Sequence, residues 1–307
     1  MHLIRHFRCT FAGMFSRRPI LRIAGALLIS GMLISCAGSG SPTQPSGPPA
    51  AGSTIVYSAV GASDVTGVGS SVLCAPYTDC PNGTGYAFVA SRLLKNQGFT
   101  VNTTNLGIPT GVISRSFQDL GNSLGRTVLG NFINQEAPFV PTDSTLITIF
   151  AGANEANIIT SALGAGAGAN DPSGYIDQQV ATFGNDYKTL MATLRSTAPK
   201  ARYVVLNVPN LAGMPFLASA SLAQRQAAQR ASVRMTTTVV NTLAGSTVSI
   251  IDLMCDARLY DRNNYSSDGF HPNDAGYALL GDLIARAATA ASWATPAGSC
   301  GQMTIVP

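Results

Sequence analysis

Five short apolar segments alternate with longer helix-like segments, and this order restricts the fold more than any other feature of the chain. The strand candidates are Thr54–Val60, Thr100–Thr104, Thr145–Phe150, Tyr203–Val208 and Val248–Leu253, and the helical segments between and after them are Gly85–Asn96, Tyr175–Arg195, Leu222–Leu243 and Ala275–Ala291. Alternating strands and helices favour a parallel sheet with helices on both faces. The near-continuous apolar run at 146–150 is typical of a central strand buried on both sides. We therefore predict an α/β fold with one mainly parallel, five-stranded sheet.

The loops that follow the strand candidates hold the residues suited to chemistry, because function in parallel sheets gathers at the carboxyl ends of the strands. Ser63 follows the first strand in a Gly-rich turn that would expose its hydroxyl, as a nucleophile requires. The loop after the second strand, Asn105–Gly111, is able to offer a backbone N–H. Asn154 follows the third strand, where its amide is able to serve as an oxyanion donor. The sequence thus predicts one cleft at this edge of the sheet.

His271 is the only histidine outside the N-terminal leader discussed below, so any chemistry of the mature protein that needs an imidazole must use it. Asp268 lies three residues earlier, within reach of the ring. Pro272 disfavours helical geometry at His271 and so predicts a loop there. Asn273 or Asp274 is then placed to cap the following helix. This arrangement predicts the base and the orienting carboxylate of a nucleophilic triad.

The order of these blocks resembles that of the GDSL/SGNH hydrolase superfamily, from Thr54 to Ala291. The resemblance implies a flavodoxin-like three-layer α/β/α sandwich and a serine esterase that needs no metal or organic cofactor and acts on a small-molecule or lipid ester. Carried over by position, Ser63 is the nucleophile, His271 the base and Asp268 its orienter. The most specific match is the block that runs from Asp268 to Asn273.

Two positions depart from the superfamily pattern. Ala62 stands where the superfamily usually has Asp, a supporting residue, so activity is expected to survive the change. The oxyanion is expected to be held by Asn154, Gly111 and the backbone N–H of Ser63, but an ungapped comparison puts Thr110 in the place of Gly111. A second function, a non-catalytic, envelope-anchored carbohydrate- or lipid-binding protein on the same fold, also fits this sequence.

The first 35 residues predict an export signal. They contain five arginines and no acidic residue, followed by an apolar run, Ile23–Ile34, too short to span a membrane. The run leads into Leu-Ile-Ser-Cys36, which resembles the lipobox of bacterial lipoproteins and implies a lipidated Cys36. The segment 16–22 also resembles a twin-arginine signal, which leaves the export route open. We predict a signal peptide (1–35), a lipidated cysteine with a Ser/Pro/Gly-rich tether (36–53), and one folded domain (54–307).

Removal of the leader changes the charge of the protein. The five leader arginines account for the excess of basic residues, and the mature chain has 14 basic against 15 acidic residues. This balance gives no support to nucleic-acid binding. We expect a cell-envelope lipoprotein, on the periplasmic side or the cell surface, held to the membrane by its lipid.

Cysteine usage agrees with export. Cys74 and Cys80 close a short loop, which leaves Cys255 to pair with Cys300 near the C-terminus. Although four cysteines allow three pairings, we predict these two disulfides. A structural zinc site is not expected, because one histidine is available and no close cysteine pair exists. The sequence does not predict the oligomeric state.

Overall fold

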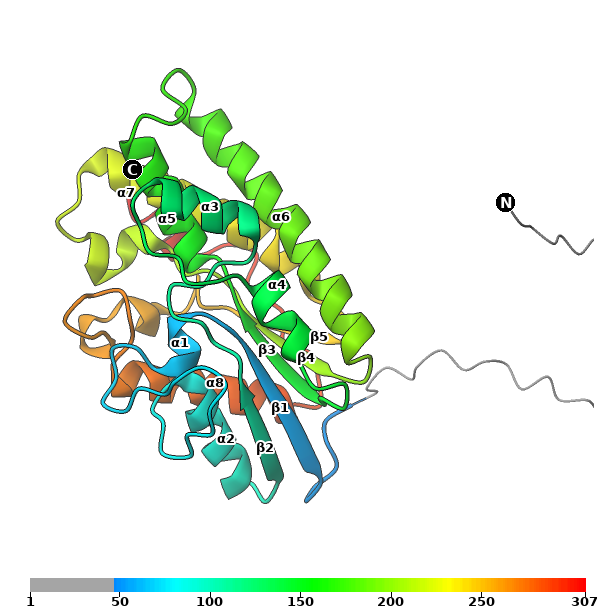
Figure 1. Ribbon diagram of the computed structural model, residues 1–307. Helices are drawn as coiled ribbons and strands as arrows, with labels where there is room; N and C mark the ends of the chain where they lie inside the picture. The colour runs from blue at the N-terminus through cyan, green and yellow to red at the C-terminus, as the bar shows by residue number, and fades with distance from the viewer. Residues whose placement is uncertain (1–46) are drawn as a thin grey trace, which may run out of the picture. The chain divides into compact units, whose positions relative to one another are not determined.

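The computed structural model describes residues 47–307, so the predicted signal peptide, Cys36 and the tether as far as residue 46 lie outside the described residues. Five strands form one sheet: β1 (Thr54–Gly61), β2 (Thr100–Asn105), β3 (Leu146–Phe150), β4 (Arg202–Leu206) and β5 (Val248–Ile251). All four neighbouring pairs are parallel, in the order β2-β1-β3-β4-β5 (Figure 1). The predicted strands and their parallel arrangement are confirmed.

Helices cover both faces of the sheet, which confirms the three-layer prediction (Figure 1). One face packs against α2 (Tyr86–Asn96) and α8 (Asp274–Thr289), and the other against α5 (Ala153–Gly164), α6 (Pro172–Thr197) and α7 (Leu222–Thr238). The shorter helices are α1 (Ser63–Thr66), α3 (Arg115–Ser123) and α4 (Phe132–Gln135), and the 3₁₀ turns are Ala137–Phe139, Leu211–Gly213, Pro215–Leu217, Val240–Leu243, Ala257–Tyr260, Arg262–Asn264 and Gly301–Thr304. Side chains of β3 enter both cores: Ile147 and Ile149 face one, and Leu146 and Phe150 the other.

Three helical segments differ from the sequence prediction. Helices α3 and α5 were not predicted, because their short, polar or Gly-containing sequences lack a clear apolar stripe. The predicted helix Leu222–Leu243 ends as an α-helix at Thr238 and continues as a 3₁₀ turn. Tertiary packing decides these boundaries, since Ile158 and Ile159 of α5 are fully enclosed by neighbouring elements.

The chain order of the strands creates a crevice at the carboxyl edge of the sheet. From β1 the chain first adds β2 on one side and then returns to add β3 on the other. The loops that leave β1 and β3 therefore diverge to opposite faces of the sheet. The crevice between two such loops is the usual position of a ligand site in parallel sheets. Ser63 follows β1 and Asn154 follows β3, so both lie at this switch point.

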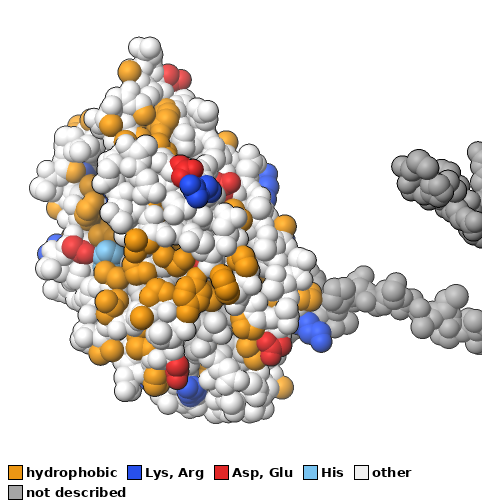
Figure 2. All heavy atoms as spheres, in the orientation of Figure 1, with side chains coloured by type: hydrophobic (Ala, Val, Ile, Leu, Met, Phe, Trp, Pro, Cys, Tyr) orange, Lys and Arg blue, Asp and Glu red, His pale blue; other side chains and the backbone are white. Residues whose placement is uncertain are grey.

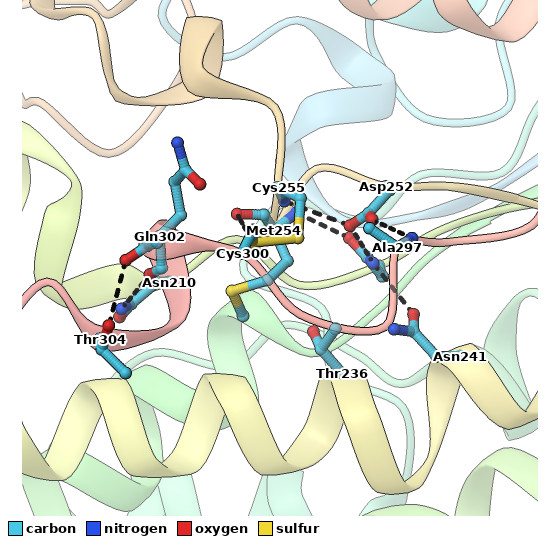
Figure 3. Close-up of a disulfide and its surroundings, with 12 residues drawn as sticks. Asn210, Thr236, Asn241, Asp252, Met254, Cys255, Ala297, Cys300, Gln302 and Thr304 are labelled. Atoms are coloured by element: carbon cyan, nitrogen blue, oxygen red, sulfur yellow. Dashed lines mark hydrogen bonds between the residues drawn. A yellow bond between two sulfur atoms is a disulfide. The ribbon is translucent and has the colours of Figure 1, made fainter.

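Both predicted disulfides, Cys74–Cys80 and Cys255–Cys300, are present. The second joins the segment after β5 to the C-terminal tail (Figure 3). The same tail is held by Ala297, whose N–H donates to Asp252 Oδ2 at 2.7 Å, and by Gln302, whose carbonyl accepts from Asn210 Nδ2 at 2.8 Å. The covalent bond and these hydrogen bonds together fix the tail to the carboxyl edge of β4 and β5.

Among residues 47–307, no helix is both long enough and apolar enough to cross a membrane. Nor does this part of the chain contain a group of three or more His, Cys, Asp or Glu side chains placed to hold a metal ion.

Candidate active site

Ser63 is the first residue of α1, two residues beyond the end of β1. It was expected in a Gly-rich turn, and the turn is a single helical turn that ends at Gly67 with φ +83°. The N–H groups of the first helical turn have no acceptor within their own helix, and the Ser63 N–H donates to no protein acceptor among residues 47–307. Ser63 is 4% exposed, so little of the residue is open to solvent.

His271 links Ser63 to Asp268. Its Nε2 lies 2.9 Å from Ser63 Oγ, and its Nδ1 lies 2.6 Å from Asp268 Oδ2. The three side chains come from opposite ends of the sequence and form one hydrogen-bonded chain. This geometry is that of a nucleophile, a base and an orienting carboxylate.

Asp268 is held in its ionised form. Burial opposes ionisation, but hydrogen bonds from the His271 ring, from the backbone N–H groups of His271 and Phe270 and from the Ser266 hydroxyl lower the pKa of Asp268 to about 2. An ionised carboxylate only accepts hydrogen bonds, so the proton of a neutral imidazole lies on Nδ1. The lone pair on Nε2 then faces the Ser63 hydroxyl, as proton abstraction requires.

The loop that carries His271 is fixed on both sides. The Asn273 side chain accepts from the N–H groups of Ala275 and Gly276, so the cap of α8 is Asn273. Asp274 instead accepts from the Ser71 N–H at 2.8 Å and ties the loop after α1 to the start of α8. Gly69 (φ +92°) lies so close to the histidine that a Cβ there would approach His271 Cβ to 2.8 Å. The ring is therefore positioned by neighbouring backbone as well as by Asp268.

Asn154 lies in the first turn of α5, and its Nδ2 donates to the Gly111 carbonyl at 2.8 Å. This bond uses one of the two amide hydrogens and orients the other. A cavity of about 10 Å³ is lined by Asn154, Gly111, Ala62 and Phe270, which come from the four loops expected to form the site. The structure thus brings the loops after β1, β2 and β3 together with the loop that carries His271.

The turn at Gly111 distinguishes the two candidates for a backbone donor. The Gly111 N–H donates to the Ile108 carbonyl at 2.8 Å, so it closes the turn and is already engaged. Thr110 has φ +63°, a backbone conformation that is uncommon for a β-branched residue. Within residues 47–307, the Thr110 N–H donates to no protein acceptor. Backbone strain of this kind is often found at ligand-binding positions.

The model of the GDSL-like lipase/acylhydrolase family matches residues 59–279, a span that begins within β1 and ends within α8. The chain belongs to this family. Membership places it among the hydrolases that act on esters. No curated protein sequence matches the chain.

Solved structures with a similar fold include other members of this class of enzyme. The lipase Lip_vut3 from a goat rumen metagenome is 14% identical, with a TM-score of 0.53 over 76% of this chain and 98% of that chain. The phospholipase A1 of Streptomyces albidoflavus NA297 is 16% identical and has a TM-score of 0.48; the match covers 76% of this chain and 99% of that chain. The extracellular lipase of Streptomyces rimosus is 18% identical and has a TM-score of 0.43; the match covers 77% of this chain and 100% of that chain. At these identities, the likeness to the rumen lipase shows a shared fold.

Glu155 is a residue of the site that the sequence interpretation missed, although it directly follows Asn154. Its Oε1 accepts from the Ile113 N–H at 2.5 Å and its Oε2 from the Gly152 N–H at 2.8 Å. The fully buried carboxyl therefore joins the loop after β2 to the loop after β3. Burial raises the pKa of Glu155 to about 7, even though these backbone N–H groups lower it.

We expect Glu155→Gln to change how stability depends on pH in this family member. Because the folded-state pKa lies above the ordinary value of 4.5, the folded protein binds the proton more tightly than the unfolded chain. The wild-type protein then loses stability as the pH rises from about 4.5 to about 7, by on the order of 3 kcal/mol. Glutamine does not titrate, so the melting temperature of the variant relative to wild type should rise between pH 5 and pH 8.

The matched control is Asp119→Asn, which removes an exposed carboxylate paired with Arg115 on α3. Its melting temperature relative to wild type should change little over the same pH range. A pH-independent difference between Glu155→Gln and wild type would contradict the assignment of this titration to Glu155.

Proposed function

We propose that the protein is a serine esterase that hydrolyses carboxylic esters through an acyl-enzyme on Ser63. The observation that carries the proposal is the hydrogen-bonded chain from Asp268 through His271 to Ser63. In this mechanism His271 takes the proton of the Ser63 hydroxyl, and the alkoxide attacks the ester carbonyl carbon. His271 then gives the proton to the departing alcohol, and it later activates the water that releases the acid.

The oxyanion formed in each step is held by hydrogen-bond donors on the opposite side of the cleft. We assign this role to the Ser63 N–H, the Asn154 amide and the Thr110 N–H. Thr110 replaces Gly111 in the assignment, because the Gly111 N–H is engaged with Ile108 and its carbonyl with Asn154. Donors fixed before the reaction stabilise the developing charge without reorganisation during the reaction.

Apolar surface beside the site supports a substrate with an apolar portion. Residues 65–78, 105–114 and 127–142 surround the loops of the site and carry only one charged side chain, the buried Glu136. Tyr77 and Phe139, exposed by 49% and 62%, contact each other edge to face with ring centroids 5.7 Å apart. Figure 2 shows a band of hydrophobic side chains beside the histidine on this face. A patch of this kind is typical of a binding surface for an apolar ligand.

Replacement of Ser63 by Ala should abolish ester hydrolysis and leave the melting temperature nearly unchanged, because alanine fits the turn but has no hydroxyl. Activity is measured with p-nitrophenyl esters of graded acyl length, and a fluorophosphonate probe followed by mass spectrometry identifies the labelled serine. Labelling of another serine, or full activity in the variant, would refute the role of Ser63. A wild-type protein inactive on every ester would favour the alternative function, a non-catalytic carbohydrate- or lipid-binding protein.

Replacement of Asn154 by Ala should lower kcat by roughly 100- to 1,000-fold with a smaller change in KM, the usual loss for one oxyanion donor. The amide is expected to bind the transition-state oxyanion more strongly than the carbonyl of the bound ester, so the effect should appear in kcat. Steady-state kinetics of the variant separate the two parameters. A change confined to KM would show that Asn154 contributes to substrate binding alone.

We also propose that the protein is exported and anchored by a lipid on Cys36, so that the ester substrate is met at the cell envelope. The proposal rests on the lipobox-like sequence that ends at Cys36 and on the two disulfides, which persist in oxidising compartments. The full-length Cys36→Ser protein should be found in the soluble fraction after cell lysis, and globomycin should block maturation of the wild type. A Cys36→Ser protein that stays in the membrane fraction after loss of its leader would contradict lipid anchoring.

A further inference from the structure

Glutamate is rare in this chain, and both glutamates are buried beneath the site. Of the 15 acidic residues, only Glu136 and Glu155 are glutamates. Glu136 is 0% exposed and Glu155 is 1% exposed. Neither forms a salt bridge within residues 47–307, and each accepts instead from backbone N–H groups of loops that carry site residues. Burial of a carboxyl group is unfavourable unless donors such as these compensate for the loss of water. We therefore ask what role the two buried carboxyl groups have in the site.

Glu136 contacts the loop that carries the candidate nucleophile. Its Oε2 accepts from the Gly61 N–H at 2.8 Å, two residues before Ser63. The Ile108 N–H, in the loop after β2, donates to the Gly61 carbonyl at 3.2 Å. Burial raises the pKa of Glu136 well above its usual range, although the hydrogen bond from the Gly61 N–H lowers it. The Glu136 side chain and the loop after β2 are thus both hydrogen-bonded to Gly61, two residues before the candidate nucleophile.

The hydrogen-bond pattern explains why a side chain is needed at this place. Strand β2 ends at Asn105, and beyond it the chain still donates to β1, from Leu106 to Ala59 and from Ile108 to Gly61. Within residues 47–307, no carbonyl of the segment after β2 accepts from the Gly61 N–H, and the Glu136 carboxyl takes that place. Ala62, at the N-cap of α1, has no polar side chain to hold the turn. Glu136 is the side-chain anchor of the segment that ends β1.

The backbone around Glu136 is itself rigidly held. The Glu136 N–H donates to the Phe132 carbonyl at 3.2 Å, and the Glu136 carbonyl accepts from Phe139 at 2.9 Å. Phe132 is buried in the core, and Asn131 caps α4 by accepting from the Asn134 N–H. The acid therefore projects from a corner between α4 and the following 3₁₀ turn that is fixed to the core. A shift of the Ser63 loop would have to break its bond to this fixed corner.

We propose that Glu136 is a positioning residue that holds Gly61, and through it the Ser63 turn, in the geometry in which the hydroxyl meets His271. This inference rests on the proposed function, because it assumes that Ser63 is the nucleophile. A misplacement of the reacting atoms by about 1 Å reduces enzymatic rates on the order of 100-fold. The role is distinct from that of Asp268, because Glu136 acts on the backbone of the nucleophile and not on the base.

The test compares three variants of Glu136 by their kcat, their KM and their rate of labelling by a fluorophosphonate. Glu136→Gln keeps an oxygen that is able to accept from Gly61, so its kcat should stay within about 3-fold of wild type. Glu136→Met has similar length without a comparable acceptor, and Glu136→Asp draws the oxygen back by one carbon–carbon bond. Both should lower kcat and the labelling rate by roughly 10- to 100-fold while KM changes little.

A matched control separates positioning from general destabilisation. Ser249→Ala removes another buried acceptor, the β5 hydroxyl that accepts from the Ala294 N–H at 3.2 Å. Strands β3 and β4 separate β5 from β1. This variant should lower the melting temperature and leave kcat unchanged. If the Met variant does not fold, the comparison of the Asp and Gln variants decides whether Glu136 positions the Ser63 turn.

The outcomes distinguish the inference from the function on which it rests. If Ser63→Ala retains activity, the proposed function fails and the inference fails with it. If Ser63→Ala is inactive but the Met and Asp variants keep wild-type kcat and labelling, only the inference is overturned. A Gln variant as slow as the Met variant would also overturn it, because the retained acceptor would then have no effect.

Discussion

Parallel pairing of β1 with strands on both sides is the constraint on which the site depends. Parallel strands place all their carboxyl ends at one edge of the sheet, so residues far apart in the sequence are delivered to the same place. β1 pairs with β2 and β3, and the loops after these three strands carry Ser63, Thr110 and Asn154. His271 reaches the same edge from the start of α8, which packs against α2 on one face. The strand order is therefore a condition for assembly of the site.

Three carboxyl groups at this edge of the molecule, those of Asp268, Glu136 and Glu155, each accept from specific donors. Asp268 is partly exposed and is kept ionised by donors from its own loop and from the imidazole. The buried Glu136 and Glu155 have raised pKa values and accept from backbone N–H groups at the end of β1 and in the loops after β2 and β3. An ionised carboxylate suits the orientation of a base, whereas a buried acid suits the joining of loops, because its hydrogen bonds are strong in an apolar environment.

Much of the fold was predictable from the sequence. Strands such as Leu146–Phe150 are continuous apolar runs, and turns separate them from helices with an apolar stripe. Helix α5 was not predicted, because Ile158 and Ile159 become informative only once the sheet that they cover is known. For the site, the sequence indicated Ser63, Asp268, His271 and Asn154, because their chemical types follow strand ends or precede a helix. It missed Glu136, which lies in a short helical corner with no local signal of a role.

The sequence by itself determined the class of the protein: the strand and helix order, the cysteine pairs and the residue types needed for ester hydrolysis are all local patterns. Only the tertiary structure decided which of these groups already have hydrogen-bond partners within residues 47–307. Thr110 and Gly111 are neighbours with equivalent backbone donors, and the turn closed on Ile108 engages one of them. Likewise, Asp64, Asp268 and Asp274 are all near His271 or its loop, yet only Asp268 accepts from the ring. Hydrogen bonds have strict limits of distance and direction, and these are set by how the loops pack together in space.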